Sequence, residues 1–270
     1  MPSSPSGRLN QIGNDLFGRG RYAEALRYYQ EALEHDRKTG DARTLVITLG
    51  NLGNISAVSG RRAQADAYYG EVLDLQKRLG DERGIGATLV NLGNLRADAG
   101  EWTRARAYYL EALDILDRLG EDTALAVLHS DLGLVARETG AFDEALRQYE
   151  RSLQLMRRLG DQAGVADVYR MLGRTYVTRR MWDEAASCAQ TSLEISERMR
   201  DDMRLAGAMY LLGGIREEQG SLAEAIRLFE RVVEFDRTYQ LPKLQENTNR
   251  LSALRERHAG ESMKGNISQA

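Results

Sequence analysis

Amide side chains recur at fixed spacing in this sequence and could bind a ligand. The string "NLGN" occupies residues 51–54 and returns at 91–94. An amide offers two donors and two acceptor lone pairs, so a row of amides can hold a peptide backbone. Alternatively, the amides could form contacts between the repeated segments of the chain itself. The predicted polar row consists of Asn14, Asn51, Asn54, Asn91, Asn94 and Asp131.

A pair of arginines offers a different chemistry further along the chain. Arg170 and Arg174 are four residues apart and therefore share one face of a helix. Two guanidinium groups on one face form a fork for a carboxylate or a phosphate. The alternative is a salt bridge within the fold, with Asp131 or Asp167 as the partner. The arginines predict an acidic or phosphorylated ligand segment.

No set of residues predicts catalysis or metal binding. The single cysteine, Cys188, has no second cysteine for a metal or redox pair. The three histidines are far apart, and His129 is expected to be a packing residue. Gly84-Ile85-Gly86 lacks the third glycine of a dinucleotide loop and follows no strand. We therefore predict a protein that is not an enzyme, with no cofactor and no metal. The histidines are His35, His129 and His258.

The composition narrows the partners and the compartment. A net charge of −3 gives no electrostatic reason to bind nucleic acid. The sequence has no apolar run long enough to span a membrane, and its polar N-terminus is unlike a signal peptide. With a single cysteine, these features predict a cytoplasmic protein. The 33 arginines against four lysines indicate a GC-rich bacterial genome.

Glycine recurs every 40 residues, which reveals six copies of one segment. Each copy contains two amphipathic stretches with apolar residues at helical spacing. We expect the repeated glycine, and an alanine twelve residues later, to let the two helix backbones approach closely. A further set of glycines ends each of the first four helix pairs and suits a left-handed conformation, at Gly40, Gly80, Gly120 and Gly160; Arg200 and Gln240 replace it in the last two. The repeated glycines are Gly13, Gly53, Gly93, Gly133, Gly173 and Gly213.

The repeat boundaries divide the chain into predicted segments. Residues 1–5 are expected to be disordered, 243–258 to form a helix that caps the last repeat, and 259–270 to be a disordered tail. Solenoids need such caps because each repeat buries its faces only against its neighbours. The predicted repeats span 6–40, 41–80, 81–120, 121–160, 161–200 and 201–240.

The pattern resembles the tetratricopeptide repeat (TPR) family over nearly the whole chain. Its small and large packing residues are readable in the third copy as Leu92-Gly93, Gly100, Ala105, Tyr109 and Ala112. The unit of 40 residues, longer than the common repeat, resembles Pins-type adaptors, Rap-type peptide receptors and bacterial regulators with TPR sensor domains. The resemblance implies an all-α, right-handed superhelical α-solenoid. Six helix-turn-helix units and a capping helix would form it, with the first helix of each pair on the concave face.

Two functions follow from this resemblance. The first is an adaptor or scaffold that binds another protein or a peptide in the concave groove. The alternative is a ligand- or peptide-sensing domain of a bacterial signalling or transcriptional regulator. No DNA-binding or catalytic segment is visible in the 270 residues, which favours the adaptor unless the chain is a fragment of a larger regulator.

Overall fold

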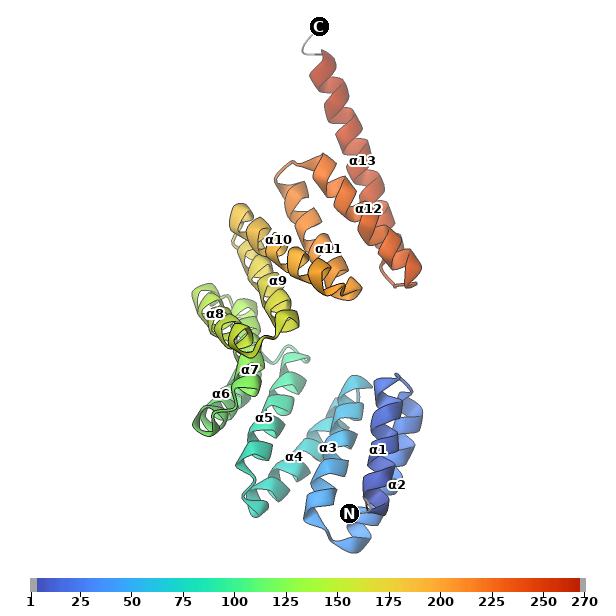
Figure 1. The fold of residues 1–270 in the computed structure, drawn as a ribbon, viewed down its shortest axis with the longest axis vertical. Helices are drawn as coiled ribbons and strands as arrows, with labels where there is room; N and C mark the ends of the chain where they lie inside the picture. Colours follow the sequence, from blue (N-terminus) through green and yellow to red (C-terminus); the bar gives the residue numbers. More distant parts are fainter. Residues whose placement is uncertain (1–3, 268–270) are drawn as a thin grey trace. The chain divides into compact units, whose positions relative to one another are not determined.

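The computed structural model describes residues 4–267, and all regular elements in that range are helices (Figure 1). They confirm the all-α prediction and its two helices per repeat. The helices are α1 (Pro5–Gly18), α2 (Tyr22–Thr39), α3 (Ala42–Val58), α4 (Arg62–Leu79), α5 (Glu82–Ala97), α6 (Trp102–Leu119), α7 (Asp122–Glu138), α8 (Phe142–Leu159), α9 (Gln162–Thr178), α10 (Trp182–Met199), α11 (Asp202–Glu218), α12 (Leu222–Thr238) and α13 (Leu244–Ile267).

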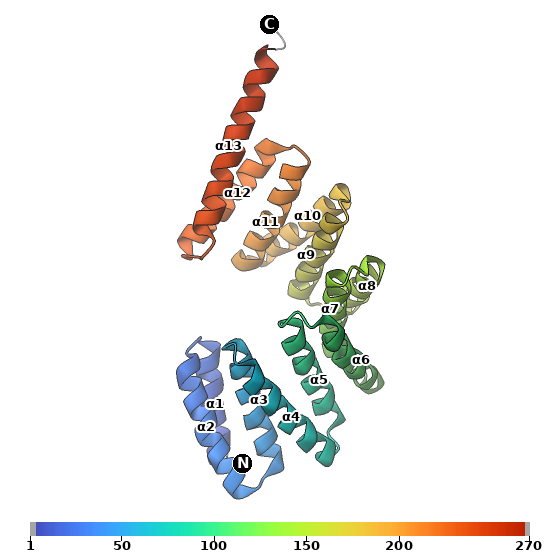
Figure 2. The same ribbon diagram turned by 180° about the vertical axis from the view of Figure 1, so that it is seen from behind.

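The chain forms two compact units, an N-terminal unit of residues 1–139 and a C-terminal unit of residues 140–270. Within each unit, consecutive helices pack as pairs, such as α1 with α2 and α11 with α12 (Figure 2). The first helices of successive repeats also touch, α1 with α3, α3 with α5, α5 with α7, and α9 with α11. This is the packing of an α-solenoid. We call the side formed by α1, α3, α5 and α7, or by α9, α11 and α13, the inner face of its unit.

Short signals between the helices end one and begin the next. Gly80 and Gly160 close α4 and α8 in the left-handed conformation, with φ of 66° and 74°. The carboxylates of Asp81 and Asp161 then accept a hydrogen bond from the first turn of the following helix, at 2.9 Å in both cases. The left-handed glycines confirm the role predicted for them from the sequence. Arg200 keeps the left-handed φ, at 56°, where the glycine is lost.

The repeated glycines make room for a tyrosine ring, which corrects the prediction of close backbone contact. A Cβ on Gly53 would lie 2.5 Å from the ring of Tyr69, and Gly93 faces Tyr109 in the same way. The tyrosine therefore fills the space between the two helices of its own repeat. The backbones do approach in the fifth repeat, where Ala189 replaces the tyrosine. A Cβ on Gly173 would there lie 3.4 Å from the carbonyl oxygen of Ala185.

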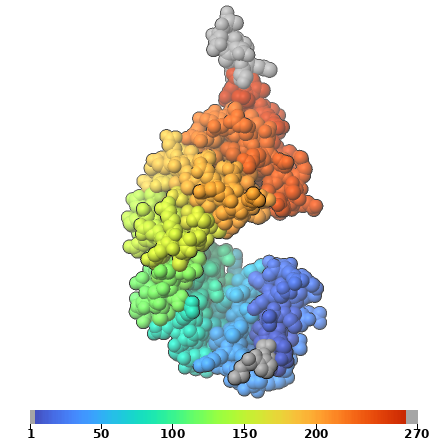
Figure 3. All heavy atoms as spheres, viewed as in Figure 1, coloured from blue at the N-terminus to red at the C-terminus, as the bar shows by residue number. Residues whose placement is uncertain are grey.

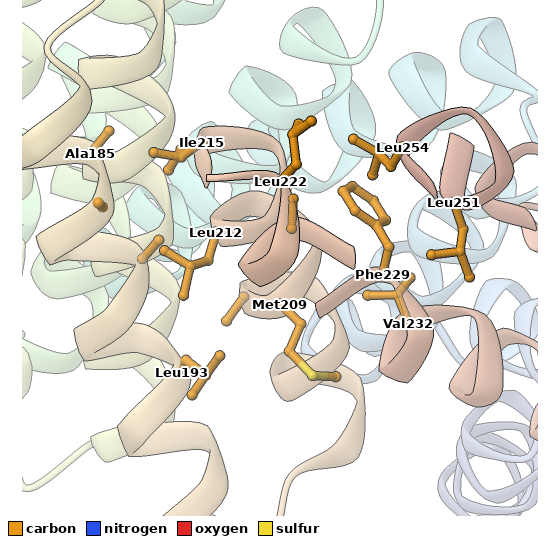
Figure 4. Packing of buried hydrophobic residues seen from close by; sticks show 14 of the residues in the cluster. Ala185, Leu193, Met209, Leu212, Ile215, Leu222, Phe229, Val232, Leu251 and Leu254 are labelled. Carbon is orange, nitrogen blue, oxygen red and sulfur yellow. The ribbon is translucent and has the colours of Figure 1, made fainter. Parts of the chain in front are cut away.

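The core of the C-terminal unit runs from α10 through α11 and α12 to α13 (Figure 4). Leu251 and Leu254 of α13 are buried in it, so this helix covers the last repeat as predicted for a cap. In the space-filling view, side chains close the gaps between neighbouring helices of each unit (Figure 3). Burial of these apolar side chains stabilises the array by about 25 cal/mol per Å² removed from water.

The two ends of the chain differ from the sequence prediction. Ser4 caps α1, and its hydroxyl accepts a hydrogen bond from the amide of Gly7 at 3.0 Å, so the helix begins at Pro5. Proline suits this position because its ring fixes a helical φ. Residues 1–3 of the predicted disordered segment lie outside the described residues. At the other end α13 continues past His258 to Ile267, through most of the predicted tail.

Candidate functional site

Three residues of the predicted polar row, called the amide row below, join the two helices of their own repeats. Asn14, Asn54 and Asn94 are exposed on α1, α3 and α5. Each amide oxygen accepts a hydrogen bond from a tyrosine hydroxyl on the second helix of the repeat. The donors are Tyr29 at 2.8 Å, Tyr69 at 2.7 Å and Tyr109 at 2.6 Å.

Burial keeps these tyrosines in the donor form, because it disfavours the phenolate. It raises the pKa of Tyr69 to about 12. The amide nitrogens of the three asparagines have no hydrogen-bond partner among residues 4–261, whose side chains the structure describes. The fold therefore uses one side of each amide and leaves the other side for a ligand or for water.

The other three residues of the row, Asn51, Asn91 and Asp131, have different surroundings from one another. Asn51 donates to Asn10 at 3.1 Å, and Asn10 donates to Thr48 at 2.6 Å, so this amide joins the first two repeats. That bond agrees with the alternative of a contact between repeats. Asn91 is half-buried on α5. Asp131 is half-buried on α7, and burial raises its pKa to about 7.

The inner face of the C-terminal unit contains a cavity of about 290 Å³ at the two predicted arginines. Arg170 and Arg174 on α9 both line it, while α11, α12 and the segment leading into α13 supply the remaining walls. These walls combine apolar side chains with one further cation, Lys243. The lining residues are Arg170, Arg174, Met203, Ala206, Gly207, Tyr210, Leu211, Val232, Phe235, Asp236, Leu241, Lys243 and Asn247.

The charges beside this cavity form a connected network of ion pairs. Arg170 contacts Asp167 at 3.3 Å, the internal salt bridge that was the alternative to ligand binding. The same carboxylate also accepts a hydrogen bond from Arg204 at 3.0 Å. Two guanidinium groups therefore share one carboxylate. Arg204 also pairs with Asp201 at 2.5 Å. The positive charge available to an incoming anion comes from the cavity lining, where Arg170, Arg174 and Lys243 lie with a single carboxylate, Asp236.

Helix α13 and the residue just before it bring two cations to the inner face that were not identified from the sequence. Arg250 lies 5.5 Å from the ring centre of Tyr210, and Lys243 lies at the same distance. Glu217 fixes Arg250 with two hydrogen bonds, at 2.8 and 3.0 Å. Both cations follow Pro242, where the period of 40 ends, so no repeat position marks them.

His129 and Cys188, for which the sequence predicted no catalytic role, both lie within helices. His129 is buried in α7, as expected for a packing residue. Cys188 is half-buried in α10, and burial raises the pKa of its thiol to about 11, which disfavours a reactive thiolate. Over the described part of the chain, no three His, Cys, Asp or Glu residues lie where they could hold a metal ion. Within the same range, no helix has the length and apolar character needed to cross a membrane.

Comparison with known families and structures gives a consistent result. The tetratricopeptide repeat matches in five overlapping stretches, at residues 8–78, 42–118, 84–158, 124–198 and 164–238. No curated protein sequence matches the chain.

Solved structures share the fold at low sequence identity. BtubC from P. vanneervenii is 20% identical, with a TM-score of 0.68 over 88% of this chain and 93% of its own. A signal-transduction ATPase with numerous domains from Pyrococcus horikoshii, which has a tetratricopeptide repeat sensor, is 13% identical. Its TM-score is 0.71 over 98% of this chain and 43% of its own. A Rap protein in complex with competence and sporulation factor is 15% identical, with a TM-score of 0.68 over 94% of this chain and 76% of its own.

Proposed function

Because the chain belongs to the tetratricopeptide repeat family, we propose that it is an adaptor that binds an acidic segment of another protein on its inner face. The observation that carries this proposal is the cavity at Arg170 and Arg174. It combines an apolar wall with an excess of cations. Such a surface suits a peptide that presents a carboxylate or phosphate beside apolar atoms.

Arg170 is the main charged anchor in this proposal, with Arg174 beside it. A ligand anion would take over part of the bonding that Arg170 now has with Asp167, while Arg204 continues to hold that carboxylate. The side chain of Arg170 packs beside Gly207 on α11. A Cβ there would lie 3.6 Å from Cδ of Arg170. Charge-assisted hydrogen bonds contribute about 1.5–3 kcal/mol each.

The amide row of the N-terminal unit is a second contact surface in this proposal. The unpaired amide nitrogens of Asn14, Asn54 and Asn94 can donate to carbonyl oxygens of an extended segment. Neutral hydrogen bonds contribute less than charged ones, about 0.5–1.5 kcal/mol each. We therefore expect the amide row to bind a segment more weakly than the arginines do.

The second candidate function is a sensor domain of a signalling regulator. It is favoured by the fold shared with the repeat sensor from Pyrococcus horikoshii and with the Rap protein bound to a competence and sporulation factor. In that case the ligand would be a short peptide, and its binding would change the packing between repeats. The same inner-face residues would bind the ligand in both functions.

A display library of random peptides, selected on the full immobilised chain, tests the binding proposal. We expect peptides rich in Asp and Glu, and we expect their enrichment to disappear on the Arg170→Ala, Arg174→Ala double variant. A library in which no acidic peptide is enriched would contradict the proposal.

A further inference from the structure

A second cavity of about 430 Å³ adjoins the one at Arg170 and Arg174. The two cavities share Tyr210 and Leu211 of α11 as lining residues, so they are neighbours along this helix. The second cavity also involves α9, the turn before α10, and α13. Its lining residues are Val177, Thr178, Arg180, Trp182, Tyr210, Leu211, Gly214, Ile215, Glu218 and Arg250.

Gly214 accounts for the open space in this second cavity. The equivalent position, directly after the repeated glycine, is Asn14, Asn54 and Asn94 in the first three repeats. A Cβ on Gly214 would meet only the guanidinium end of Arg250, at 3.3 Å. A glycine inside a helix costs about 1 kcal/mol relative to alanine, and helix packing does not explain this one.

The neighbouring glycine in α11 shows the contrast. A Cβ on Gly213 would lie 2.9 Å from the ring of Phe229 in α12, so packing between the two helices of the repeat explains that residue. Gly214 lies instead on the inner face. The absence of a side chain there keeps the cavity open.

The walls of the second cavity suit an aromatic ring. Trp182 and Tyr210 offer two aromatic surfaces, and Val177, Leu211 and Ile215 add aliphatic ones. Aromatic pairs contribute about 0.5–1.5 kcal/mol beyond the area that they bury. A cation over a ring adds an attraction of similar size.

Arg180 supplies an unpaired cation for that ring. Its side chain is exposed and has no ion-pair partner among residues 4–261. Its backbone has a φ of 57°, at the position where other repeats have glycine, as in Gly140 and Gly220. The left-handed conformation costs a non-glycine residue about 1–2 kcal/mol. Glu218 in the same cavity disfavours a second carboxylate there, so the acidic group of the ligand belongs in the first cavity.

We propose that the second cavity binds an aromatic side chain of the ligand, next to the acidic residue held by Arg170 and Arg174. This inference rests on the proposed function and specifies its ligand: a segment with Phe, Tyr or Trp adjacent to Asp or Glu. A cavity of about 430 Å³ is within the usual size range of ligand pockets, about 300–1,000 Å³.

The random-peptide display library described above separates the two proposals when it is selected on three forms of the full chain. On the wild type we expect an acidic residue adjacent to an aromatic one. On Gly214→Asn, which restores the residue of the first three repeats, the aromatic preference should disappear while the acidic one remains. On the Arg170→Ala, Arg174→Ala double variant the acidic preference should disappear.

Binding measurements with the most enriched peptide give the size of the change in affinity. Gly214→Asn should weaken it about tenfold or more, because the ring loses its site. The control Gly70→Asn replaces a helix glycine of α4 that faces open space and should leave the affinity unchanged. Both variants should melt no lower than the wild type, because asparagine is a better helix former than glycine.

Arg180→Gly is a second test of whether this cavity binds an aromatic side chain. It restores the residue of the other repeats and removes the cation, so the protein should be more stable and the aromatic preference weaker. Acidic enrichment without an aromatic residue on the wild type would overturn this inference and leave the proposed function standing. An aromatic preference that survives in both Gly214→Asn and Arg180→Gly would also overturn it, and a library with no enrichment would overturn both proposals.

Discussion

The hydroxyl of Tyr109 donates a hydrogen bond to the amide oxygen of Asn94 at 2.6 Å, and so joins the two helices of the third repeat. The same pair occurs in the first two repeats, where the asparagine precedes the tyrosine by 15 residues. The sixth repeat has neither residue, with Gly214 and Phe229 at the equivalent positions. The pairing indicates that these amides serve the fold first, and that the sixth repeat is free to use this position differently.

A double-mutant cycle on this pair measures its contribution to stability. Asn94→Ala and Tyr109→Phe should each lower the free energy of unfolding by about 1 kcal/mol, and the double variant should cost less than their sum. Chemical denaturation of the four proteins gives the coupling. Strictly additive effects would mean that the bond contributes nothing.

Gly93→Ala should destabilise the N-terminal unit by about 1–3 kcal/mol, because the new methyl group would press on the ring of Tyr109. Gly70→Ala is the matched control. That glycine also lies inside a helix, but nothing stands within 4 Å of its Cβ position, so alanine should raise stability by up to about 1 kcal/mol. Thermal melts of the two variants should therefore shift in opposite directions, and equal shifts would refute the packing role of the tyrosine ring.

Asp131 should make the stability of the N-terminal unit depend on pH. Burial raises its pKa from 3.8 to about 7, so the native state holds this proton more tightly than the unfolded chain does. Stability contributed by the protonated form therefore falls as the pH rises from about 4 to about 7, and the loss is complete above that range.

Asp131→Asn should remove this dependence, because the amide is uncharged and matches Asn51 and Asn91 at the equivalent positions. Compared with the wild type, the variant should be more stable by about 1–3 kcal/mol near pH 8 and nearly unchanged near pH 4. Denaturant titrations at the two pH values provide the measurement. A stabilisation that is the same at both would show that the carboxyl group does not titrate in this range.

Asn247→Ala should loosen the capping helix. The side chain of Asn247 donates to the buried carboxylate of Asp236 at 2.7 Å, and its loss would leave that carboxylate without this donor. The expected cost is about 1–3 kcal/mol, seen as faster hydrogen exchange across α13. Asn249→Ala, an exposed asparagine on the same helix, is the control and should leave exchange unchanged. Equal exchange in both variants would argue against the anchoring role.

The fold was largely predictable from the sequence because its determinants repeat. The glycine period sets the packing positions, and residues such as Asp81 and Gly160 mark helix ends by local chemistry that needs no tertiary context. The contact of Gly93 with the ring of Tyr109 was not predictable from either residue alone. Small residues permit close backbones as readily as they permit a ring, and only the neighbouring helix decides between the two.

The candidate site was less predictable because it depends on departures from the repeat. Arg170 and Arg174 were identified by their spacing on one helix. Lys243 and Arg250 were missed because they follow Pro242, where the register of the repeat no longer applies. Gly214 was visible as a change of residue type, and comparing its column with Asn14, Asn54 and Asn94 could have identified it. The pairing of each such asparagine with a tyrosine could have been found in the same way.

Calorimetry of an enriched acidic peptide against the wild type and the Arg170→Ala, Arg174→Ala double variant measures whether these arginines anchor the ligand. The matched control is Arg227→Ala with Arg231→Ala, an exposed pair at the same spacing on the second helix α12. An anchoring role predicts at least about tenfold weaker binding for the first variant, no change for the control, and weaker wild-type binding as salt increases. Full affinity in a folded Arg170→Ala, Arg174→Ala variant would contradict it, and would leave these arginines as internal salt-bridge partners only.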